Sequence, residues 1–171
     1  MTKRYPTFVD YLKAEYAGPF CATDIVIRHD PAIQDKDITI PWDSSIVLIE
    51  RKNFPYGPAW PGGMGEHMTL AKNAVKEAKE ETNLLAILDS VYQPLCVLSE
   101  IDQDPRAHIA SITYTAQGYG VLKAGDDAKR THLVSLTALE SLAQDERNWA
   151  MPHHQKIAIF YLNEVQKYVH N

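Results

Sequence analysis

Apolar residues along the chain recur at two spacings, one typical of helices and one typical of strands. Helical spacing predicts a short helix over residues 6–16, a longer helix over 69–82 and a closing helix over 152–169. A further short helix is expected to begin at Thr137. Pro152 suits the first turn of the closing helix, where no backbone N–H is needed.

Strands are predicted where apolar and β-branched residues run together or alternate with polar ones. The expected strands lie at residues 20–28, 45–50, one or two within 86–99, 107–117 and 132–135. Residues 29–37 and 118–127 are expected to form loops. Because helices and strands interleave without a strict alternation, the sequence predicts an α/β fold with a mixed β-sheet, in one layered domain over residues 1–171.

The segment 52–65 stands apart because it contains three prolines and four glycines. Such a composition argues against a regular helix or strand, so we expect one long loop here. Loops of this length in compact domains are often functional. This loop leads directly into the predicted helix over 69–82, and the two are therefore considered together.

Composition and charge narrow the class of protein. The net charge is −5 and the pI is near 5.8, which argues against a large surface for a nucleic-acid polymer but allows one nucleotide held by a metal. No apolar run approaches the roughly 18 residues of a membrane span, and the first residues lack the apolar stretch of a signal peptide. We therefore expect a cytoplasmic protein with no membrane partner. Cys21 and Cys96 are expected to be buried, reduced thiols.

Three glutamates share one face of the predicted helix over 69–82. At about 100° per residue, Glu77, Glu80 and Glu81 fall within one arc of roughly 100°. Neither Asn73 nor Ala74, the residues one turn before Glu77, is basic, so we expect no lysine or arginine of the helix to pair with it. Like charges at this spacing repel by about a few tenths of a kcal/mol each.

Two interpretations of this acidic face compete. It is either a solvated surface, where water screens the repulsion, or a site for a hard cation such as Mg²⁺, which prefers oxygen ligands and substrate phosphates. The preceding Gly62-Gly63 favours the cation, because glycine lets the backbone approach a ligand closely and can offer a free carbonyl.

The run WPGGMGEHMTLAKNAVKEAKEETNL resembles the Nudix box, which is expected over about residues 62–84. The Gly-Gly pair, the Ala-Val before the basic residue and the Glu-x-x-Glu-Glu run match the family pattern in order. The resemblance implies a Nudix-like α/β/α sandwich that uses Mg²⁺ or Mn²⁺. It also implies Glu77 and Glu81 as the main metal ligands, with Glu80 in support and the carbonyl of Gly62 as a further ligand.

The box departs from the family pattern at several positions. Its loop is one residue shorter, Met68 stands where the family has its first glutamate, Lys76 replaces the arginine, and Asn83 replaces the glycine after the glutamates. Lysine lacks the bidentate fork of arginine, whereas asparagine tolerates the left-handed conformation at a helix end. Glu66 either matches a glutamate common just after the family's Gly-Gly or substitutes for the missing one.

Segments outside the box resemble the ADP-ribose pyrophosphatase-like members of the family. They are VLIERKNFPYGPAWPGG, DPRAHIAS and GDDA, so that the resemblance covers roughly residues 20–135. It implies magnesium-dependent hydrolysis of a nucleoside diphosphate linked to another group, with ADP-ribose as the first candidate. Many relatives form dimers, and a homodimer is therefore left open.

Two other functions remain compatible with the sequence. The first is a Nudix-fold binding or regulatory module that has lost turnover, which the altered Met68 and Lys76 suggest. The second is a pyrophosphohydrolase for a nucleoside triphosphate, because those enzymes share the box.

Substrate contacts are expected from four charged residues outside the helix. Arg51 lies just before the glycine loop, and Arg106 can clamp a diphosphate because a guanidinium suits phosphate geometry. Asp126 and Asp127 can bond to ribose hydroxyls. For each residue, an ordinary surface or turn position is the competing interpretation.

Some further residues carry weaker expectations. One of the loop acids Glu100, Asp102 and Asp104 is a candidate for a remote base or metal ligand. His153 and His154 are adjacent on a helix and point in different directions, so a surface or capping role is expected rather than a shared metal. Tyr56 and Trp60 flank the glycine loop and either stack on a base or pack in the core.

Overall fold

A computed structural model describes residues 7, 10, 18–125 and 128–169 of the chain. The helix predicted over residues 6–16 falls almost wholly outside this range. The elements of the described part are β1 (Phe20–His29), β2 (Ile46–Arg51), β3 (Pro58–Ala59), β4 (Gly62–Met64), α2 (Leu70–Thr82), β5 (Leu85–Leu88), β6 (Cys96–Leu98), β7 (Ile109–Tyr119), β8 (Ala128–Val134), α3 (Leu136–Leu142), the 3₁₀ helix η1 (Glu146–Asn148) and α4 (Pro152–Val169).

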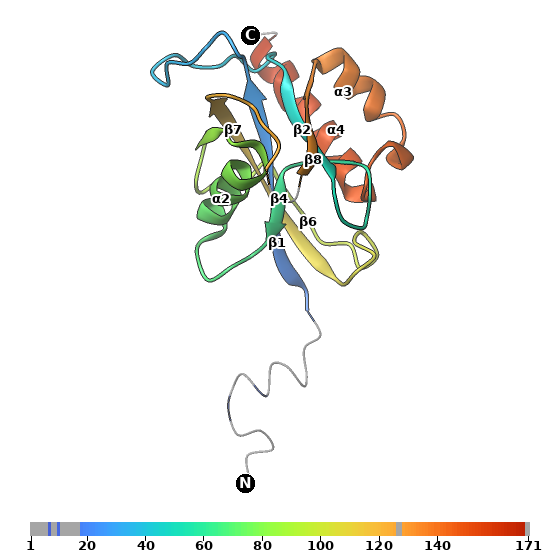
Figure 1. Ribbon diagram of the computed structural model, residues 1–171. Coiled ribbons are helices and arrows are strands. Elements are labelled where there is room, and N and C mark those ends of the chain that lie inside the picture. The colour runs from blue at the N-terminus through green and yellow to red at the C-terminus, as the bar shows by residue number, and fades with distance from the viewer. Residues whose placement is uncertain (1–6, 8–9, 11–17, 126–127, 170–171) are drawn as a thin grey trace.

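The strands form one mixed sheet, as the sequence predicts. Its central path runs β3-β2-β1-β7-β5, and β4, β6 and β8 pair with β1, β7 and β2 respectively. The long central strands β1 and β7 are parallel, with Phe20 opposite Ile109 and His29 opposite Gly118, while β1 pairs antiparallel with β2 and β4. Figure 1 shows β4 lying across the front of this central pair.

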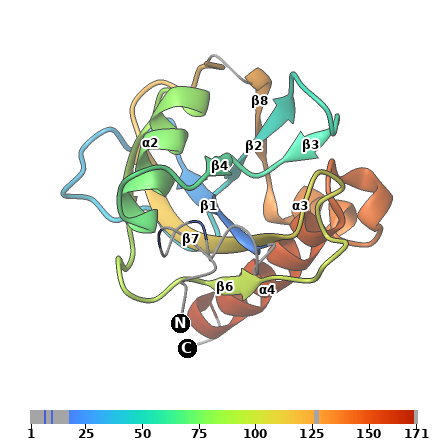
Figure 2. The ribbon, with the colours of Figure 1, turned by 90° about the horizontal axis from the view of Figure 1, so that it is seen from below.

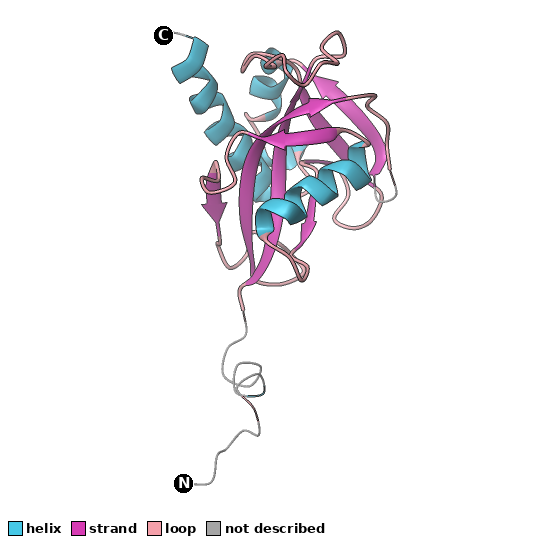
Figure 3. Ribbon diagram, turned by 90° about the vertical axis from the view of Figure 1, so that its left-hand side faces the viewer, coloured by secondary structure: helices cyan, strands magenta, loops and turns pink. Residues whose placement is uncertain are grey.

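Helices cover both faces of the sheet, which confirms the α/β/α sandwich. Alternation along β1 sends Ile25 and Ile27 toward α2, whereas Val26 joins the core between the sheet and the C-terminal helices. Figures 2 and 3 show α2 on one side of the β1–β7 pair and α4 on the other. In the described part of the chain, no helix is long and apolar enough to span a membrane.

The glycine loop departs from the sequence expectation. Residues 52–65 contain the short strands β3 and β4, so the prediction of one irregular loop is wrong. Gly62 and Gly63 pair with Asp24 and Thr23 of β1, and a side chain at Gly62 would have its Cβ 2.2 Å from the Thr23 carbonyl oxygen. Glycine therefore permits strand pairing at this distance, where any other residue would collide.

Smaller differences concern the last strand and the cysteines. β8 begins at Ala128, four residues before the predicted start at His132, and pairs along β2. The expectation that both thiols are buried is wrong, because Cys21 is exposed near the start of β1 and Cys96 is only partly buried. Both cysteines are free.

Candidate active site

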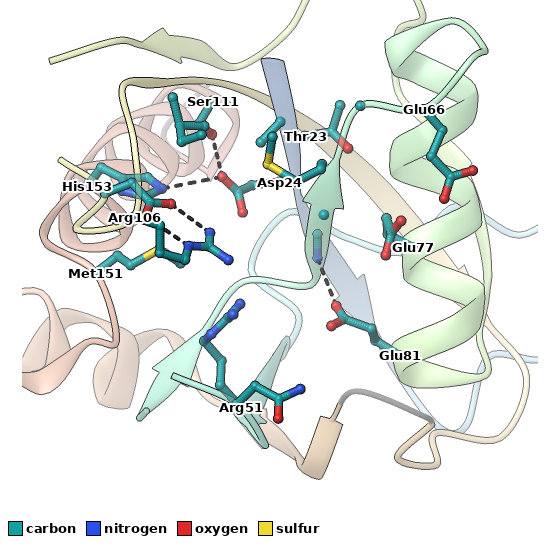
Figure 4. Close-up of a pocket in the computed structure, with 18 of the residues that line it drawn as sticks. Thr23, Asp24, Arg51, Glu66, Glu77, Glu81, Arg106, Ser111, Met151 and His153 are labelled. Carbon is teal, nitrogen blue, oxygen red and sulfur yellow. Dashed lines mark hydrogen bonds and ion pairs between the residues drawn. The ribbon is translucent and has the colours of Figure 1, made fainter. Parts of the chain in front are cut away.

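A cavity of about 380 Å³ opens over the glycine strand β4. It brings together residues from α2, β1, β2, β4, β7, the loop before β7 and the segment that leads into α4. Figure 4 shows the carboxylates of α2 on one side of β4, with Asp24, Arg106 and His153 on the other.

Helix α2 presents two of the three predicted glutamates to this cavity. The helix begins after Thr69, whose side chain accepts a hydrogen bond from the Lys72 N–H, and ends at Asn83 in the left-handed conformation. Between these caps, Glu77 and Glu81 line the cavity. The expected tolerance of Asn83 at the helix end is confirmed by its φ of 62°.

The glycine strand fixes both carboxylates. The Gly62 N–H donates to Glu81 Oε2 over 2.8 Å, and Glu81 is only 5% exposed. A Cβ at Gly63 would lie 2.7 Å from the Glu77 carboxyl carbon, so only glycine allows Glu77 its position. Burial raises the pKa of Glu77, although the neighbouring Lys76 opposes the shift.

Glu80 and Glu66 meet at the lysine that replaces the box arginine. Lys76 Nζ lies 2.7 Å from Glu80, 3.0 Å from Glu66 and 3.4 Å from Glu77. These carboxylates, Glu80 first and then Glu66, raise the pKa of Lys76. The expectation that no basic residue of the helix pairs with Glu77 is therefore wrong, because a long lysine side chain can fold back over its own neighbour.

The Glu66–Lys76 contact bears on the missing first glutamate of the box. Met68, which stands at that place in the sequence, is 39% exposed. Glu66 lines the cavity and forms an ion pair with Lys76, which favours the alternative that it substitutes for the missing glutamate. Glu80 lies outside the cavity lining, on the half-exposed side of the same ion-pair network.

Two guanidinium groups face the carboxylates. Arg51 donates from Nε to the Pro55 carbonyl over 2.9 Å, and both burial and the neighbouring charge of Arg106 lower its pKa. Arg106 forms a fork with Asp104, at 2.9 Å from Nε and 2.7 Å from Nη2. Like charges kept so close in one cavity form a favourable surface for an anion.

The acidic loop and the remaining substrate candidates are only partly brought into the site. Of Glu100, Asp102 and Asp104, the cavity lining includes Asp104 alone. Burial by itself would raise the pKa of Asp104, but the hydrogen bonds from Arg106 lower this pKa below its usual value. Asp126 and Asp127 lie outside the described residues.

The expectation of a surface position for the two histidines is wrong. His153 and His154 are 3% and 1% exposed, and their rings meet edge to face at Asp24, with centroids 4.5 Å apart. Because the N-terminus of α4 packs against the sheet, side chains that diverge along the helix can still converge on one strand residue. Burial by itself would raise the pKa of Asp24, but the two histidines lower this pKa below its usual range.

Sequence reasoning also missed Asp24 and Ser111, both of which line the cavity. Ser111 donates a hydrogen bond from its hydroxyl to Asp24. A signal for Asp24 was present, because it is the one charged residue before Arg28 in the predicted strand over residues 20–28. Such a residue needs a partner, but the sequence does not say which one.

The aromatic candidates divide between core and surface. Trp60 is 1% exposed and packs on Trp149, so its core interpretation is confirmed. Tyr56 is exposed and lies outside the cavity lining, whereas Phe54, which contacts Tyr56 edge to face, lines the cavity.

Comparison with known proteins assigns the chain to a family. A curated relative from Methanocaldococcus jannaschii, named ADP-ribose pyrophosphatase, is 40% identical over 124 residues, 70% of this chain and 67% of that protein. A solved MutT/Nudix family protein from Enterococcus faecalis has a TM-score of 0.66 at 25% identity, covering 96% of this chain and 71% of that one. The chain belongs to the Nudix hydrolase family. It is a pyrophosphohydrolase of that family by the same comparisons.

The Nudix fold is also found in a more distant structure. The Nudix domain of NrtR from Shewanella oneidensis, solved with ADP ribose, has a TM-score of 0.65 at 16% identity, covering 93% of this chain and 99% of that domain. No family model matches the chain. Strand β4, the turn after it and helix α2 contain the segment that resembles the Nudix box.

Proposed function

We propose that this Nudix hydrolase cleaves the diphosphate of a nucleoside diphosphate linked to another group, ADP-ribose or a related nucleotide sugar, with Mg²⁺ or Mn²⁺ as its cofactor. The observation that carries the proposal is one cavity with the carboxylates Glu77 and Glu81 on one side and the guanidinium groups of Arg51 and Arg106 on the other. A diphosphate with a bound cation has the complementary charges.

The carboxylate side fits a hard divalent cation. Gly63 has no side chain where it meets Glu77, and the Gly62 N–H holds Glu81 in place. Glu77 and Glu81 would hold the metal, supported by Glu80 and the carbonyl of Gly62. When bound, such a cation polarises the phosphate oxygens and stabilises the charge that develops as water attacks.

The remaining residues bind and orient the substrate or move the proton. Arg51 and Arg106 bind the non-bridging phosphate oxygens. Glu66 accepts the proton of the attacking water, because its carboxylate lines the cavity and is held by an ion pair with the flexible Lys76. Lys76 positions the carboxylates of Glu66 and Glu80 through its ion pairs with them. Asp126 and Asp127 are proposed to contact the ribose.

A panel of substrates tests the proposal. ADP-ribose, other nucleoside diphosphate sugars and nucleoside triphosphates are incubated with Mg²⁺, with Mn²⁺ and with a chelator, and the released phosphorylated products are separated. We expect ADP-ribose to be cleaved fastest and the chelator to stop the reaction. Faster cleavage of triphosphates would remove the substrate assignment and leave the enzyme class in place.

Binding without turnover is the second candidate. The altered positions Met68 and Lys76 favour it, and the similar NrtR domain was solved with ADP ribose. Calorimetry with ADP-ribose, run beside the assay, separates the two functions, because a binding module shows affinity and no product. The cytoplasmic location and the homodimer stay predictions. Size-exclusion chromatography with light scattering measures the mass of the protein in solution and tests the homodimer.

A further inference from the structure

A second polar cluster lies on the α4 side of the sheet, across β4 from the glutamates. It consists of Asp24 from β1 and of His153 and His154 from the first turn of α4, with exposed fractions of 7%, 3% and 1%. One oxygen or nitrogen from each of the three residues lies within 4.8 Å of the others. Two imidazoles and a carboxylate are buried close together here. Their hydrogen bonds show which ring nitrogens carry protons and which face the carboxylate with a lone pair.

The hydrogen bond of His153 decides which of its nitrogens carries a proton. Its Nδ1 lies 3.2 Å from the Gln103 carbonyl oxygen, which can only accept, so Nδ1 carries the proton. In the neutral ring Nε2 then has a lone pair, and it faces Asp24 Oδ2 at 3.7 Å. A lone pair and an anionic oxygen face each other favourably only when a cation lies between them.

His154 faces the other oxygen of the same carboxylate, and because its Nδ1 accepts a hydrogen bond from the Trp60 backbone N–H, the neutral ring carries its proton on Nε2. Its Nε2 is buried with no hydrogen-bond partner in the described part of the chain, 3.5 Å from Asp24 Oδ1. Separations of 3.5 and 3.7 Å exceed the roughly 2.7–2.9 Å of a charge-assisted hydrogen bond. They suit ligands that surround one ion at about 2.0–2.2 Å each.

We propose that Asp24, His153 and His154 bind one transition-metal ion of the zinc class, separate from the hard cation assigned to Glu77 and Glu81. Two imidazoles and one carboxylate are a donor set that suits Zn²⁺, Co²⁺ or Fe²⁺ and that Mg²⁺ does not favour. Asp24 and His153 also line the cavity, so a water or phosphate oxygen can reach the remaining coordination position.

Metal binding changes one existing contact in a defined way. The Trp60 N–H now lies 3.3 Å from His154 Nδ1, a long hydrogen bond. A ring that ligates through Nε2 carries its proton on Nδ1, so this contact must open when the ion binds. The Trp60 indole N–H keeps its 2.9 Å bond to the His154 carbonyl, which holds the loop in place.

Cobalt titration tests the site independently of hydrolysis. Protein without a histidine tag is stripped with a chelator, saturated with Mg²⁺ and titrated with Co²⁺. We expect one equivalent of Co²⁺ to bind and to give the intense visible absorption of a site with nitrogen ligands and low coordination number. Zn²⁺ should displace it and shift the Nε2 resonances of both histidine rings in ¹⁵N spectra of the wild-type protein.

Variants assign the ligands. His153→Gln and Asp24→Asn should each weaken Co²⁺ binding by about tenfold or more, whereas Glu77→Gln and the exposed-histidine control His132→Gln should leave it unchanged. The ¹⁵N measurement needs no variant and decides the matter if either substitution fails to fold. Absence of Mg²⁺-resistant Co²⁺ binding, or its survival in a folded His153→Gln protein, overturns the proposal and leaves a shared proton between Asp24 and His153.

Discussion

The two sides of the cavity are built in opposite ways. On the α2 side, Glu77 and Glu81 come from one helix, four residues apart, and meet a glycine strand that begins eight residues before the helix. On the α4 side, Asp24, Ser111 and His153 come from three separate elements of the chain. The comparison shows that the residues on one side of a cavity can be recognised from their spacing in the sequence, whereas those on the other side are brought together only by tertiary packing.

The largest expected effect is on the α2 side. Glu81→Gln should lower turnover by roughly 100-fold or more, because one metal-binding charge is lost. The amide oxygen can still accept the hydrogen bond from Gly62, so the melting temperature should hardly change. Steady-state rates and thermal melts measure both quantities, with the exposed Glu140→Gln as control. An unchanged turnover rate in Glu81→Gln would contradict the assignment of Glu81 as a metal ligand on the α2 side.

Gly63→Ala should have the next largest effect. The added Cβ would lie 2.7 Å from the Glu77 carboxyl carbon and push the carboxylate away. A displacement near 1 Å is expected to reduce turnover by about 10- to 100-fold. Gly120→Ala is a matched control, since nothing lies within 4 Å of its Cβ but its φ is +105°. The control should lose stability and keep its rate; equal rate losses in both variants would contradict the argument.

On the α4 side, the Asp104–Arg106 pair gives a pH signature. The pKa of Asp104 lies below its usual value of 3.8 in the folded protein. The ionised pair therefore stabilises the fold above about pH 4, and this stabilisation disappears as the pH falls through the lowered pKa.

Asp104→Asn isolates that contribution. It should cost roughly 1 kcal/mol of unfolding free energy at pH 7, discounted for the exposure of Arg106. Urea melts at several pH values measure it, and the gap between variant and wild type should close below about pH 4. The exposed neighbour variant Asp102→Asn should show no such gap, and a gap that widens in acid would refute the assigned sign.

The smallest effect is expected at the altered box positions. Lys76→Arg should change turnover by less than about twofold, because its partners Glu66 and Glu80 are half exposed. Met68→Glu should also be tolerated, since that side chain is 39% exposed and would not bury a charge. A double-mutant cycle in turnover measures their coupling, and strict additivity would show that the two positions do not communicate.

The sequence by itself determined the α2 side of this protein. The helical period placed Glu77 and Glu81 on one face, and the interleaved pattern indicated an α/β fold with a mixed sheet. The Gly62-Gly63 pair singled out the neighbouring segment, although its strand β4 was expected to be a loop. These features depend on neighbours within about one helical turn or one short loop, whose geometry the backbone fixes. Arg51 and Arg106, which residue type suggested as substrate contacts, both line the cavity, and their contact with a substrate stays a prediction.

Only the tertiary structure decided the α4 side. Asp24 and His153 are joined because α4 packs its N-terminus on the sheet beside β1, and no local period encodes the meeting of residues so far apart in the chain. The contact between Lys76 and Glu77 was missed for a related reason. A flexible lysine side chain can reach several carboxylates, and sequence spacing alone does not show which of them it contacts. Local periodicity fixes which face a residue occupies, whereas packing between distant segments fixes what that face contacts.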